Sequence, residues 1–337
     1  MTSPKNSSGP EPAAVGSDER FVADTERYRR ELLAHCYRMV GSVHEAEDLV
    51  QETYIRAWRG FAAFEGRASV RTWLYTIATN VCTTALGDHR RRVLPAGLGG
   101  AYEGPDTPPN PEAGNGISWL QPLPDALITP SADDPEASVI DRESLRLALV
   151  ASLQHLPARQ RAILMLRDVL AFSAAETAEM LGTTTAAVKT GLRRARARLT
   201  DLADPADLLE PTDPRAQALL EGYIAAFEHS DAHLLEQVLR ADATLEATPF
   251  KNWYAGKLAC IRQLRKYVLG APGDWRMFPA LANGQPAVVT YHRDEHGTMA
   301  PYGAAVLTLT ATGISRVVAF QDSTLVSAFG FPAAPRQ

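Results

Sequence analysis

The amino-acid sequence predicts a multidomain protein with two all-α domains followed by a C-terminal α+β domain. Its overall charge of −5 conceals a block pattern, because residues 20–93 and 141–200 carry +3 and +5 while residues 94–140 carry −7. Both basic blocks show the 3.6-residue apolar period of helices. The last block contains strand-like runs separated by the turn signals ANGQP and DEHG. These observations indicate two basic helical domains around an acidic linker, with a mixed domain after them.

Cysteine usage and hydropathy exclude several classes of protein. The three cysteines, Cys36, Cys82 and Cys260, lie far apart, so the sequence predicts no metal site, redox motif or disulfide framework. Residues 1–20 lack the apolar core of a signal peptide, and their Ser/Pro/Gly-rich composition predicts a disordered tail. No apolar run is long enough to span a membrane. We therefore expect a cytoplasmic protein without a cofactor.

A helix-turn-helix pattern occupies residues 173–199. The stretch SAAETAEMLG predicts a short helix closed by Gly182, and a threonine at 183–185 can cap a second helix. Apolar residues at helical spacing give this second helix a buried stripe beside a basic one. Such a helix fits the major groove of DNA, although it can also be a basic, solvated helix. The cations that we expect to contact DNA are Lys189, Arg193, Arg194 and Arg196.

Residues 44–64 predict an amphipathic helix with one acidic face. Asp48 and Glu52 recur on that face at helical spacing, with Gln51 beside them. An acidic face on an otherwise basic domain suits a basic protein partner better than DNA. The alternative is a face that is simply solvated.

Residues 64–92 predict a loop around Gly66, then a helix with an apolar face and a polar stripe rich in threonine. Hydroxyl and amide groups beside a cationic helix end suit the base edges and phosphates of opened DNA. We expect Trp73 to be part of the core and leave Tyr75 open.

Together these motifs resemble the sigma-70 family of bacterial RNA polymerase initiation factors, in particular its extracytoplasmic-function group. AEDLVQETYIRAW, RTWLYTIATN and the helix-turn-helix carry the resemblance over about residues 21–93 and 141–200. The resemblance implies region 2 at 21–93, a linker at 94–140 and region 4 at 141–203. It also implies the partners: core RNA polymerase, through its β′ clamp helices and β subunit, and the −10 and −35 promoter elements.

The resemblance assigns roles to three sets of residues. Asp48, Gln51 and Glu52 are expected to bind the polymerase, and the helix bearing Lys189 is expected to read the −35 element. The −10 element is expected to contact Arg67, Ser69, Asn80, Thr83, Arg90 and Arg91. One position departs from the family, because Thr84 stands where an aspartate is frequent. The linker is expected either to occupy a basic, nucleic-acid channel of the polymerase or to act as a plain spacer.

Residues 213–332 resemble SnoaL-like domains, which are α+β cones related to polyketide cyclases and ketosteroid isomerases. The stretch 219–239 predicts an amphipathic helix, and strand-like runs follow at 287–292, 304–310 and 314–320. His292, Asp242 and Asp322 match the catalytic residue types of that family. Aromatic residues that could line a pocket, but are more often core, are Trp253, Tyr254, Tyr291 and Phe278. We assign no catalytic residue and expect no enzyme activity.

The sequence therefore predicts a sigma factor whose C-terminal domain contacts the sigma domains within the same chain and modulates their activity. Two alternatives remain open at this point. One is a stand-alone helix-turn-helix regulator, which leaves residues 21–93 unexplained. The other is a SnoaL-like enzyme or ligand sensor tethered to DNA.

Overall fold

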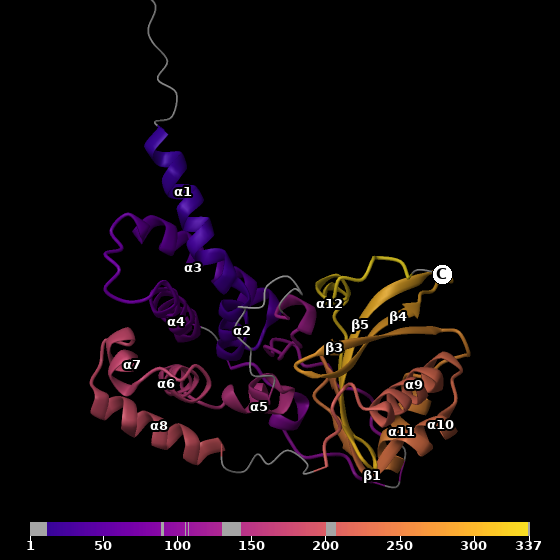
Figure 1. Cartoon of the computed structure of the whole chain (residues 1–337). Helices are drawn as coiled ribbons and strands as arrows, with labels where there is room; N and C mark the ends of the chain where they lie inside the picture. Colours follow the sequence, from indigo (N-terminus) through magenta and orange to yellow (C-terminus); the bar gives the residue numbers. More distant parts are fainter. Residues whose placement is uncertain are drawn as a thin grey trace, which may run out of the picture.

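Figure 1 shows the computed structural model, in which two sets of helices pack against each other and against a C-terminal sheet. The structure describes residues 12–88, 91–104, 106, 108–129, 143–199 and 207–335. The predicted multidomain architecture, with two all-α parts and one α+β part, is confirmed.

Region 2 consists of helices that surround a central, buried helix, α2. The helices are α1 (Pro12–Thr25), η1 (Glu26–Tyr28), α2 (Arg29–Val40), α3 (Val43–Phe61) and α4 (Val70–Asp88). Helix α1 contradicts the predicted disorder for residues 12–20, whereas residues 1–11 lie outside the described residues. Proline is well tolerated at the first position of a helix, where its missing N–H would have no partner, so Pro12 does not oppose this helix.

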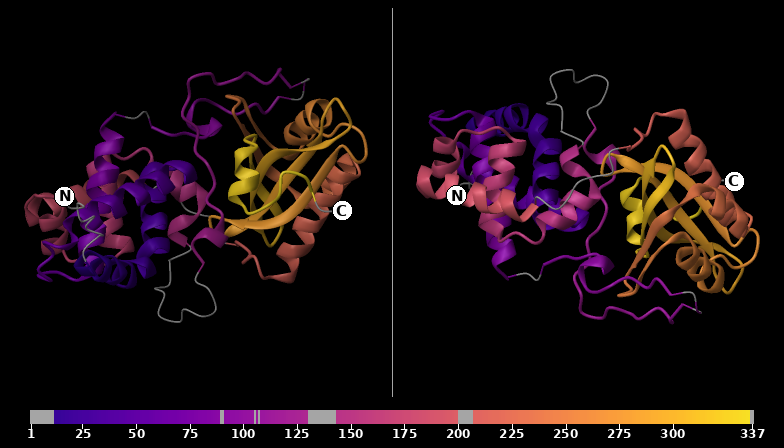
Figure 2. Two further views of the ribbon diagram at one scale, coloured as in Figure 1. Left: turned by 90° about the horizontal axis from the view of Figure 1, so that it is seen from above. Right: turned by 90° about the horizontal axis from the view of Figure 1, so that it is seen from below.

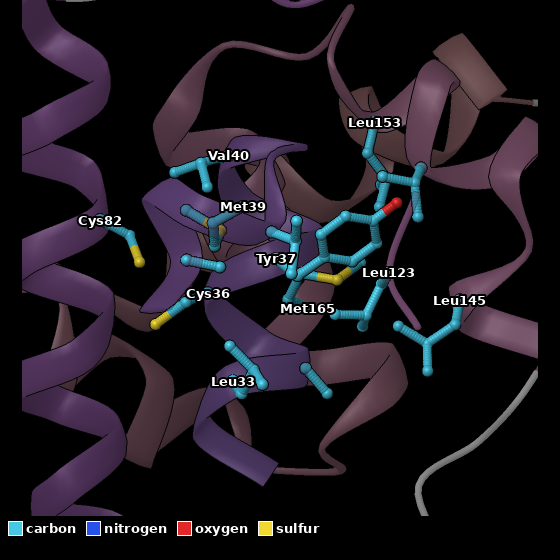
Figure 3. Packing of buried hydrophobic residues seen from close by; sticks show 14 of the residues in the cluster. Leu33, Cys36, Tyr37, Met39, Val40, Cys82, Leu123, Leu145, Leu153 and Met165 are labelled. Atoms are coloured by element: carbon cyan, nitrogen blue, oxygen red, sulfur yellow. The ribbon is translucent and has the colours of Figure 1, made fainter. Parts of the chain in front are cut away.

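Helix α2 is buried on nearly all sides although it carries several polar side chains. Figure 3 shows Tyr37 of this helix surrounded by Leu123, Leu153 and Met165, which come from the linker and from region 4. His35 contacts Thr79 of α4 at 3.0 Å, and its burial lowers the pKa of the imidazole to about 3. His35 is therefore neutral at physiological pH.

Region 4 has the helix-turn-helix that the sequence predicts. Its elements are η4 (Glu143–Leu145), α5 (Leu147–Leu153), α6 (Ala158–Leu164), the π-helical turn η5 (Met165–Val169), α7 (Ala174–Met180) and α8 (Thr185–Leu199). Ser173 and Glu176 form a reciprocal capping box at the start of α7. Gly182 has a φ of 56° in the turn, and Thr184 accepts a hydrogen bond from the Ala187 amide at the start of α8.

The C-terminal domain is a curved six-stranded sheet with the strand order β2-β1-β6-β5-β4-β3. The strands are β1 (Leu239–Thr248), β2 (Trp253–Ala255), β3 (Trp275–Ala282), β4 (Gln285–Arg293), β5 (Met299–Thr310) and β6 (Gly313–Phe320). The three predicted strands lie within β4, β5 and β6. The turn signals ANGQP and DEHG connect β3 to β4 and β4 to β5, and Asn283 and Gly284 have φ values of 58° and 67°.

The helix predicted over 219–239 is two helices in the structure. The C-terminal helices are α9 (Pro214–Glu228), α10 (Ala232–Val238), α11 (Lys257–Tyr267) and α12 (Thr324–Ala328). Ser230 has a φ of 53°, and the Asp231 side chain accepts a hydrogen bond from the His233 amide. A left-handed residue followed by an N-cap ends one helix and starts another, a break that the apolar period does not reveal.

The two faces of the sheet belong to different cores. One face packs against α9, α10 and α11, and it includes Val288 and Leu307. The opposite face includes Val289 and Val306 and belongs to the same core cluster as α12 and the buried residues of regions 2 and 4. Because neighbouring residues of a strand point to opposite faces, strand β4 takes part in both cores. The C-terminal domain is therefore joined to regions 2 and 4 by packing.

The linker runs alongside the C-terminal domain as an extended segment. Within its described residues it forms the short 3₁₀ turns η2 (Pro95–Gly97) and η3 (Asp125–Leu127) and several isolated β-bridges. These bridges pair Tyr102 with Tyr254, Ala113 with Phe250 and Pro124 with Ala282. Both views of Figure 2 show the violet loop of the linker beside the C-terminal domain.

Asn283 connects the β3–β4 turn to three other segments. Its amide nitrogen donates to the Tyr37 hydroxyl at 2.8 Å and to the Leu145 carbonyl at 2.7 Å. Its amide oxygen accepts a hydrogen bond from the Leu123 amide at 3.0 Å. The side chain is fully buried, so these bonds are made away from water. Asn283 thus joins region 2, the linker and the start of region 4 to the sheet.

We predict that Asn283→Ala lowers the free energy of unfolding by about 3 kcal/mol, because it leaves buried polar groups without partners and strains a positive φ. Asn283→Gly keeps the φ accessible and should lose about 1 kcal/mol less. Urea unfolding of the two variants measures the difference. Equal stability of the wild type and both variants would contradict the structural role of this amide.

Candidate nucleic-acid and protein interfaces

The recognition helix α8 presents a basic face to solvent. Val188, Leu192 and Ala195 are buried against the rest of region 4, as their spacing predicts. Lys189, Arg193 and Arg194 are exposed on the remaining surface of the helix. Buried apolar residues therefore fix the helix so that these cations point outward.

Arg196 differs from the other three predicted cations. Its guanidinium donates two hydrogen bonds to the Asp168 carboxylate, at 2.7 and 2.9 Å. Both side chains are partly exposed, and the pairing raises the pKa of Arg196, which remains charged. The pair anchors α8 to the π-helical turn, so a DNA contact by Arg196 has to compete with Asp168.

Arg159, at the start of α6, extends the basic surface and was missed by the sequence analysis. A groove beside α8 is lined by Arg159, Thr190 and Arg194 among other residues. The Arg159 guanidinium donates to the carbonyl of Leu181, at the end of α7. Because Arg159 lies on α6 and not on α8, it has no periodic relation to the α8 stripe, and helical periodicity could not have revealed it.

The loop at 65–69 and helix α4 form the second candidate surface for nucleic acid. Arg67 is exposed and pairs with Glu65 at 2.6 Å, while the Ser69 hydroxyl accepts the Thr72 amide at the start of α4. Asn80 is exposed farther along the helix. Ser69 thus has a structural role as a helix cap in addition to any role in binding.

The threonine side chains on α4 are less available to contact nucleic acid than their helical spacing suggests. The Thr83 hydroxyl bonds the Thr79 carbonyl at 2.8 Å, and Thr79 itself is buried against His35. Arg91 lies 3.1 Å from a ring nitrogen of His155 in region 4. Arg90 lies outside the described residues. Among the described residues of this predicted set, the exposed members are therefore Arg67, Ser69, Asn80 and Arg91.

The third candidate surface is the outer face of α3. Asp48 and Gln51 are exposed, and Glu52 accepts a hydrogen bond from Arg56 at 2.6 Å. The structure adds Ile55 and Trp58, whose side chains are 44% and 54% exposed. Ile55 and Trp58 lie seven residues after Asp48 and Gln51, respectively, which places all four on one face of the helix. The same spacing is visible in the sequence, although the predicted polymerase-binding set did not include these two residues.

Large exposed apolar side chains beside carboxylates are typical of protein–protein contacts rather than of DNA contacts. Glu45, by contrast, is turned toward the linker, where Arg92 donates to its carboxylate at 2.8 Å. The available surface on α3 therefore runs from Asp48 to Trp58.

Regions 2 and 4 contact each other through an arginine that lies between aromatic rings. Arg71 of α4 bonds the Glu31 carboxylate at 3.0 Å and lies 5.5 Å from the ring centre of Phe172, in the loop before α7. Tyr75 donates to the same carboxylate at 3.0 Å, and its ring packs edge-on against Phe172. Burial raises the pKa of the Tyr75 phenol, which keeps it a donor. Tyr75 is thus part of the core, which answers the question that the sequence left open.

Trp73 is partly buried rather than enclosed in the core. Its ring stacks on that of Phe64, near the start of the loop between α3 and α4, with ring centres 4.7 Å apart.

The C-terminal residues of catalytic type do not converge. Asp242 is paired with Arg240 at 2.8 Å, and Asp322 accepts the Gln121 amide of the linker at 3.1 Å. His292 packs against Trp275 with ring centres 4.5 Å apart. The cavity on the helix-covered side of the sheet is lined by none of these three residues.

The four predicted pocket aromatics lie in different surroundings. Tyr254 lines the cavity, whereas Phe278 and Tyr291 belong to the opposite face of the sheet. The Trp253 indole donates to the Gly99 carbonyl of the linker at 2.7 Å.

Neither a metal site nor a membrane span is found among the described residues. No group of three or more His, Cys, Asp or Glu side chains in that part of the chain is arranged to hold a metal ion. No described helix is long and apolar enough to cross a bilayer.

The two helical regions match the domains of one class of protein, the sigma-70 initiation factors. The Sigma-70 region 2 family matches residues 25–92, and the Sigma-70, region 4 family matches residues 146–199. Proteins with these two regions bind core RNA polymerase and promoter DNA, and they are transcription initiation factors rather than enzymes.

Relatives of similar length narrow the class. The chain is 49% identical over 335 residues to the ECF RNA polymerase sigma factor SigG of Mycobacterium tuberculosis, covering 96% of this chain and 87% of SigG. It is 31% identical over 226 residues to SigJ of the same species, covering 66% of this chain and 63% of SigJ. The chain therefore belongs to the extracytoplasmic-function (ECF) sigma factors.

The crystal structure of the Mycobacterium tuberculosis sigma factor SigJ has the same fold. It aligns with a TM-score of 0.59 at 22% identity, covering 93% of this chain and 99% of that one. The helical regions followed by a C-terminal α+β domain are thus shared with SigJ.

Proposed function

We propose that this ECF sigma factor exists in a closed state, in which its C-terminal domain and linker hold regions 2 and 4 together, and that it opens to initiate transcription. In the open state, the surface of α3 from Asp48 to Trp58 docks on the β′ clamp helices of core polymerase. The loop at 65–69 and α4 read the −10 element, and α8 reads the −35 element. The packing of regions 2 and 4 against each other is the observation that carries this proposal.

The closed packing is too compact for a promoter. By their names the two elements lie about 25 base pairs apart, which is roughly 85 Å along a duplex with 3.4 Å per base pair. Helix α4 contacts α6, and α6 contacts α8. With 8–10 Å between the axes of packed helices, α4 and α8 lie roughly 20 Å apart. Regions 2 and 4 therefore have to separate before both elements can be bound.

The C-terminal domain and the linker add to the direct contacts between regions 2 and 4 that oppose this separation. Asn283 bonds both Tyr37 and Leu145, and Gln285 accepts the Leu147 amide at 3.0 Å. The linker adds a hydrogen bond from Tyr37 to the Gln121 carbonyl at 2.8 Å. A domain that bonds both regions stabilises the state in which they touch, and this supports a regulatory role for it.

A stand-alone helix-turn-helix regulator fits the structure less well. That function needs only α7 and α8, whereas α3 presents Ile55 and Trp58 in a form suited to a protein partner. A cytoplasmic location remains a prediction.

The first prediction of the proposed function concerns the polymerase-binding surface of α3. Asp48→Lys with Glu52→Lys should weaken binding to core polymerase at least tenfold, because both carboxylates become cations on an exposed face. Trp58→Ala should weaken binding comparably by removing an apolar anchor. Glu221→Lys, the same charge reversal at an exposed position on α9 of the C-terminal domain, is the control. Fluorescence anisotropy with labelled protein measures affinity, and wild-type binding by the double variant would place the polymerase contact elsewhere.

The recognition helix gives the second prediction. In the complex with core polymerase, Lys189→Ala should reduce the slope of log affinity against log salt by about 0.9 if this lysine neutralises one phosphate. Arg193→Ala should lower transcription from a promoter with a −35 element about 10-fold to 100-fold by loss of a base contact. Arg265→Ala, which removes an exposed cation from α11 of the C-terminal domain, is the control. Retention of both the slope and the transcription would remove α8 from the promoter contact.

The third prediction concerns the separation of regions 2 and 4 from the closed state. At limiting core polymerase, Asn283→Gly should raise the rate of promoter-specific initiation severalfold above the wild type, because it weakens the closed state without touching a binding surface. The control is Asp294→Ala in the β4–β5 turn, where Asp294 accepts hydrogen bonds from His296 and Thr298 of the same turn. Lower transcription by a folded Asn283→Gly variant would instead make the C-terminal domain a required part of the initiation complex.

A further inference from the structure

The C-terminal domain contains a cavity of about 170 Å³ between the sheet and its helices. Phe227 of α9, Leu264 of α11 and Met277 of β3 form parts of its wall. For scale, an engineered apolar cavity of about 150 Å³ is large enough to hold benzene. The cavity therefore has room for a substituted single ring or a small fused bicycle.

Two buried polar atoms in the wall of this cavity have no hydrogen-bond partner among the described residues. They are the Tyr254 hydroxyl and Oε1 of Gln263, on side chains that are 4% and 5% exposed. A buried polar group without a partner lowers stability, so native proteins rarely keep one unless something else satisfies it. Here both atoms are on side chains that line the same cavity.

The rest of the lining sets the charge of a possible ligand. It consists of aliphatic, aromatic, amide and hydroxyl side chains, with no Asp, Glu, Lys, Arg or His among them. Burial raises the pKa of Tyr254 to about 12 and also raises that of Tyr302, so both phenols are uncharged at neutral pH. A charged ligand would lose its hydration here without gaining a counter-ion.

We propose that this cavity binds a neutral, mainly apolar molecule of one or two fused rings, with an N–H or O–H group that donates to Oε1 of Gln263. The Tyr254 hydroxyl is placed to bond a second polar atom of the ligand. The ring is held by contact with the aromatic and aliphatic wall. The inference concerns binding, and it requires no chemical step in the cavity.

The linker forms part of the same site. Pro111 lines the cavity, and the Tyr267 hydroxyl, on a side chain that also lines it, lies 2.7 Å from Oδ1 of Asn110. The ring of Tyr102 packs edge-on against Tyr254, with ring centres 6.0 Å apart. A ligand bonded to Tyr254 fixes the ring on which Tyr102 rests, so occupancy holds the linker in place. Through the linker, and resting on the proposed function, the ligand would favour the closed state.

Indole is a suitable probe, because it is a neutral bicycle with one N–H donor. We expect saturable binding of indole to the full-length protein by isothermal titration calorimetry. Indene has nearly the same shape without the donor and should bind at least fivefold more weakly. Indole-2-carboxylate is charged and should not bind. Failure of indole to bind, or equal binding of the carboxylate, overturns the proposal.

Gln263→Leu separates a ligand site from a merely structural residue. The variant should have a higher melting temperature than the wild type, because it removes the unsatisfied amide, and it should lose the preference for indole over indene. Gln217→Leu, an exposed change on α9, should leave the preference intact. A preference unchanged in Gln263→Leu overturns the assignment. If this variant does not fold, the comparison of indole with indene on the wild type still decides.

Hydrogen exchange tests the link to the linker without any transcription assay. The Tyr102 amide donates to Trp253, and the Ala255 amide donates to Tyr102. Indole should slow exchange at both amides severalfold. Binding without this protection would retain the ligand site and remove its connection to the linker, whatever the outcome for initiation.

Discussion

The closed structure depends on the burial of polar side chains along one helix, α2. A buried polar group is stable only when it is bonded, and the partners of these groups come from distant parts of the chain. His35 uses Thr79 of α4, Arg38 bonds Ser144 in η4 at 2.6 Å, and the Tyr37 hydroxyl is bonded by Asn283 of the sheet. Each partner belongs to a different segment, so the helix cannot satisfy its side chains unless region 2, region 4 and the C-terminal domain come together. Satisfying these buried polar groups therefore contributes to the specificity of the closed arrangement.

The sheet connects the ligand cavity to this polar core because its two faces have different neighbours. Val288 faces the helices that enclose the cavity, while Val289 faces the core shared with the sigma regions. The linker runs along the same domain and contacts both sides of the arrangement, with Tyr102 near the cavity and Leu123 at Asn283. A change on the cavity side therefore has a short physical route to the contacts that hold regions 2 and 4. The route consists of one sheet and one extended segment, both of which are shared by the two cores.

Much of the fold follows from local sequence signals, while the joints between domains do not. The helix-turn-helix was predictable because Gly182 and the apolar stripe of α8 specify their local geometry. Separation of α9 from α10 depends on Ser230 in a left-handed conformation, which the apolar period cannot show. The site residues divide in the same way. Exposure of Lys189 follows from helical periodicity, but the engagement of Arg196 by Asp168 depends on how two helices meet. The role of Asn283 was hidden because Asn-Gly also marks an ordinary hairpin turn, and its three partners are more than 100 residues away.

Because the C-terminal domain is covalently attached, the contacts that hold the closed state can be weaker than those of a separate inhibitor. Groups joined by a flexible segment meet at effective concentrations near the millimolar range, so contacts too weak to hold a separate inhibitor can hold a tethered one. Polymerase then has to compete with a closure of modest free energy, and a ligand can shift the balance only by its difference in affinity for the closed and open states. The cavity meets this condition because Pro111 of the linker lines it in the closed state, and any opening that lifts the linker removes that part of the wall. A ligand that touches Pro111, or that fixes the Tyr254 ring against which Tyr102 of the linker packs, therefore distinguishes the two states.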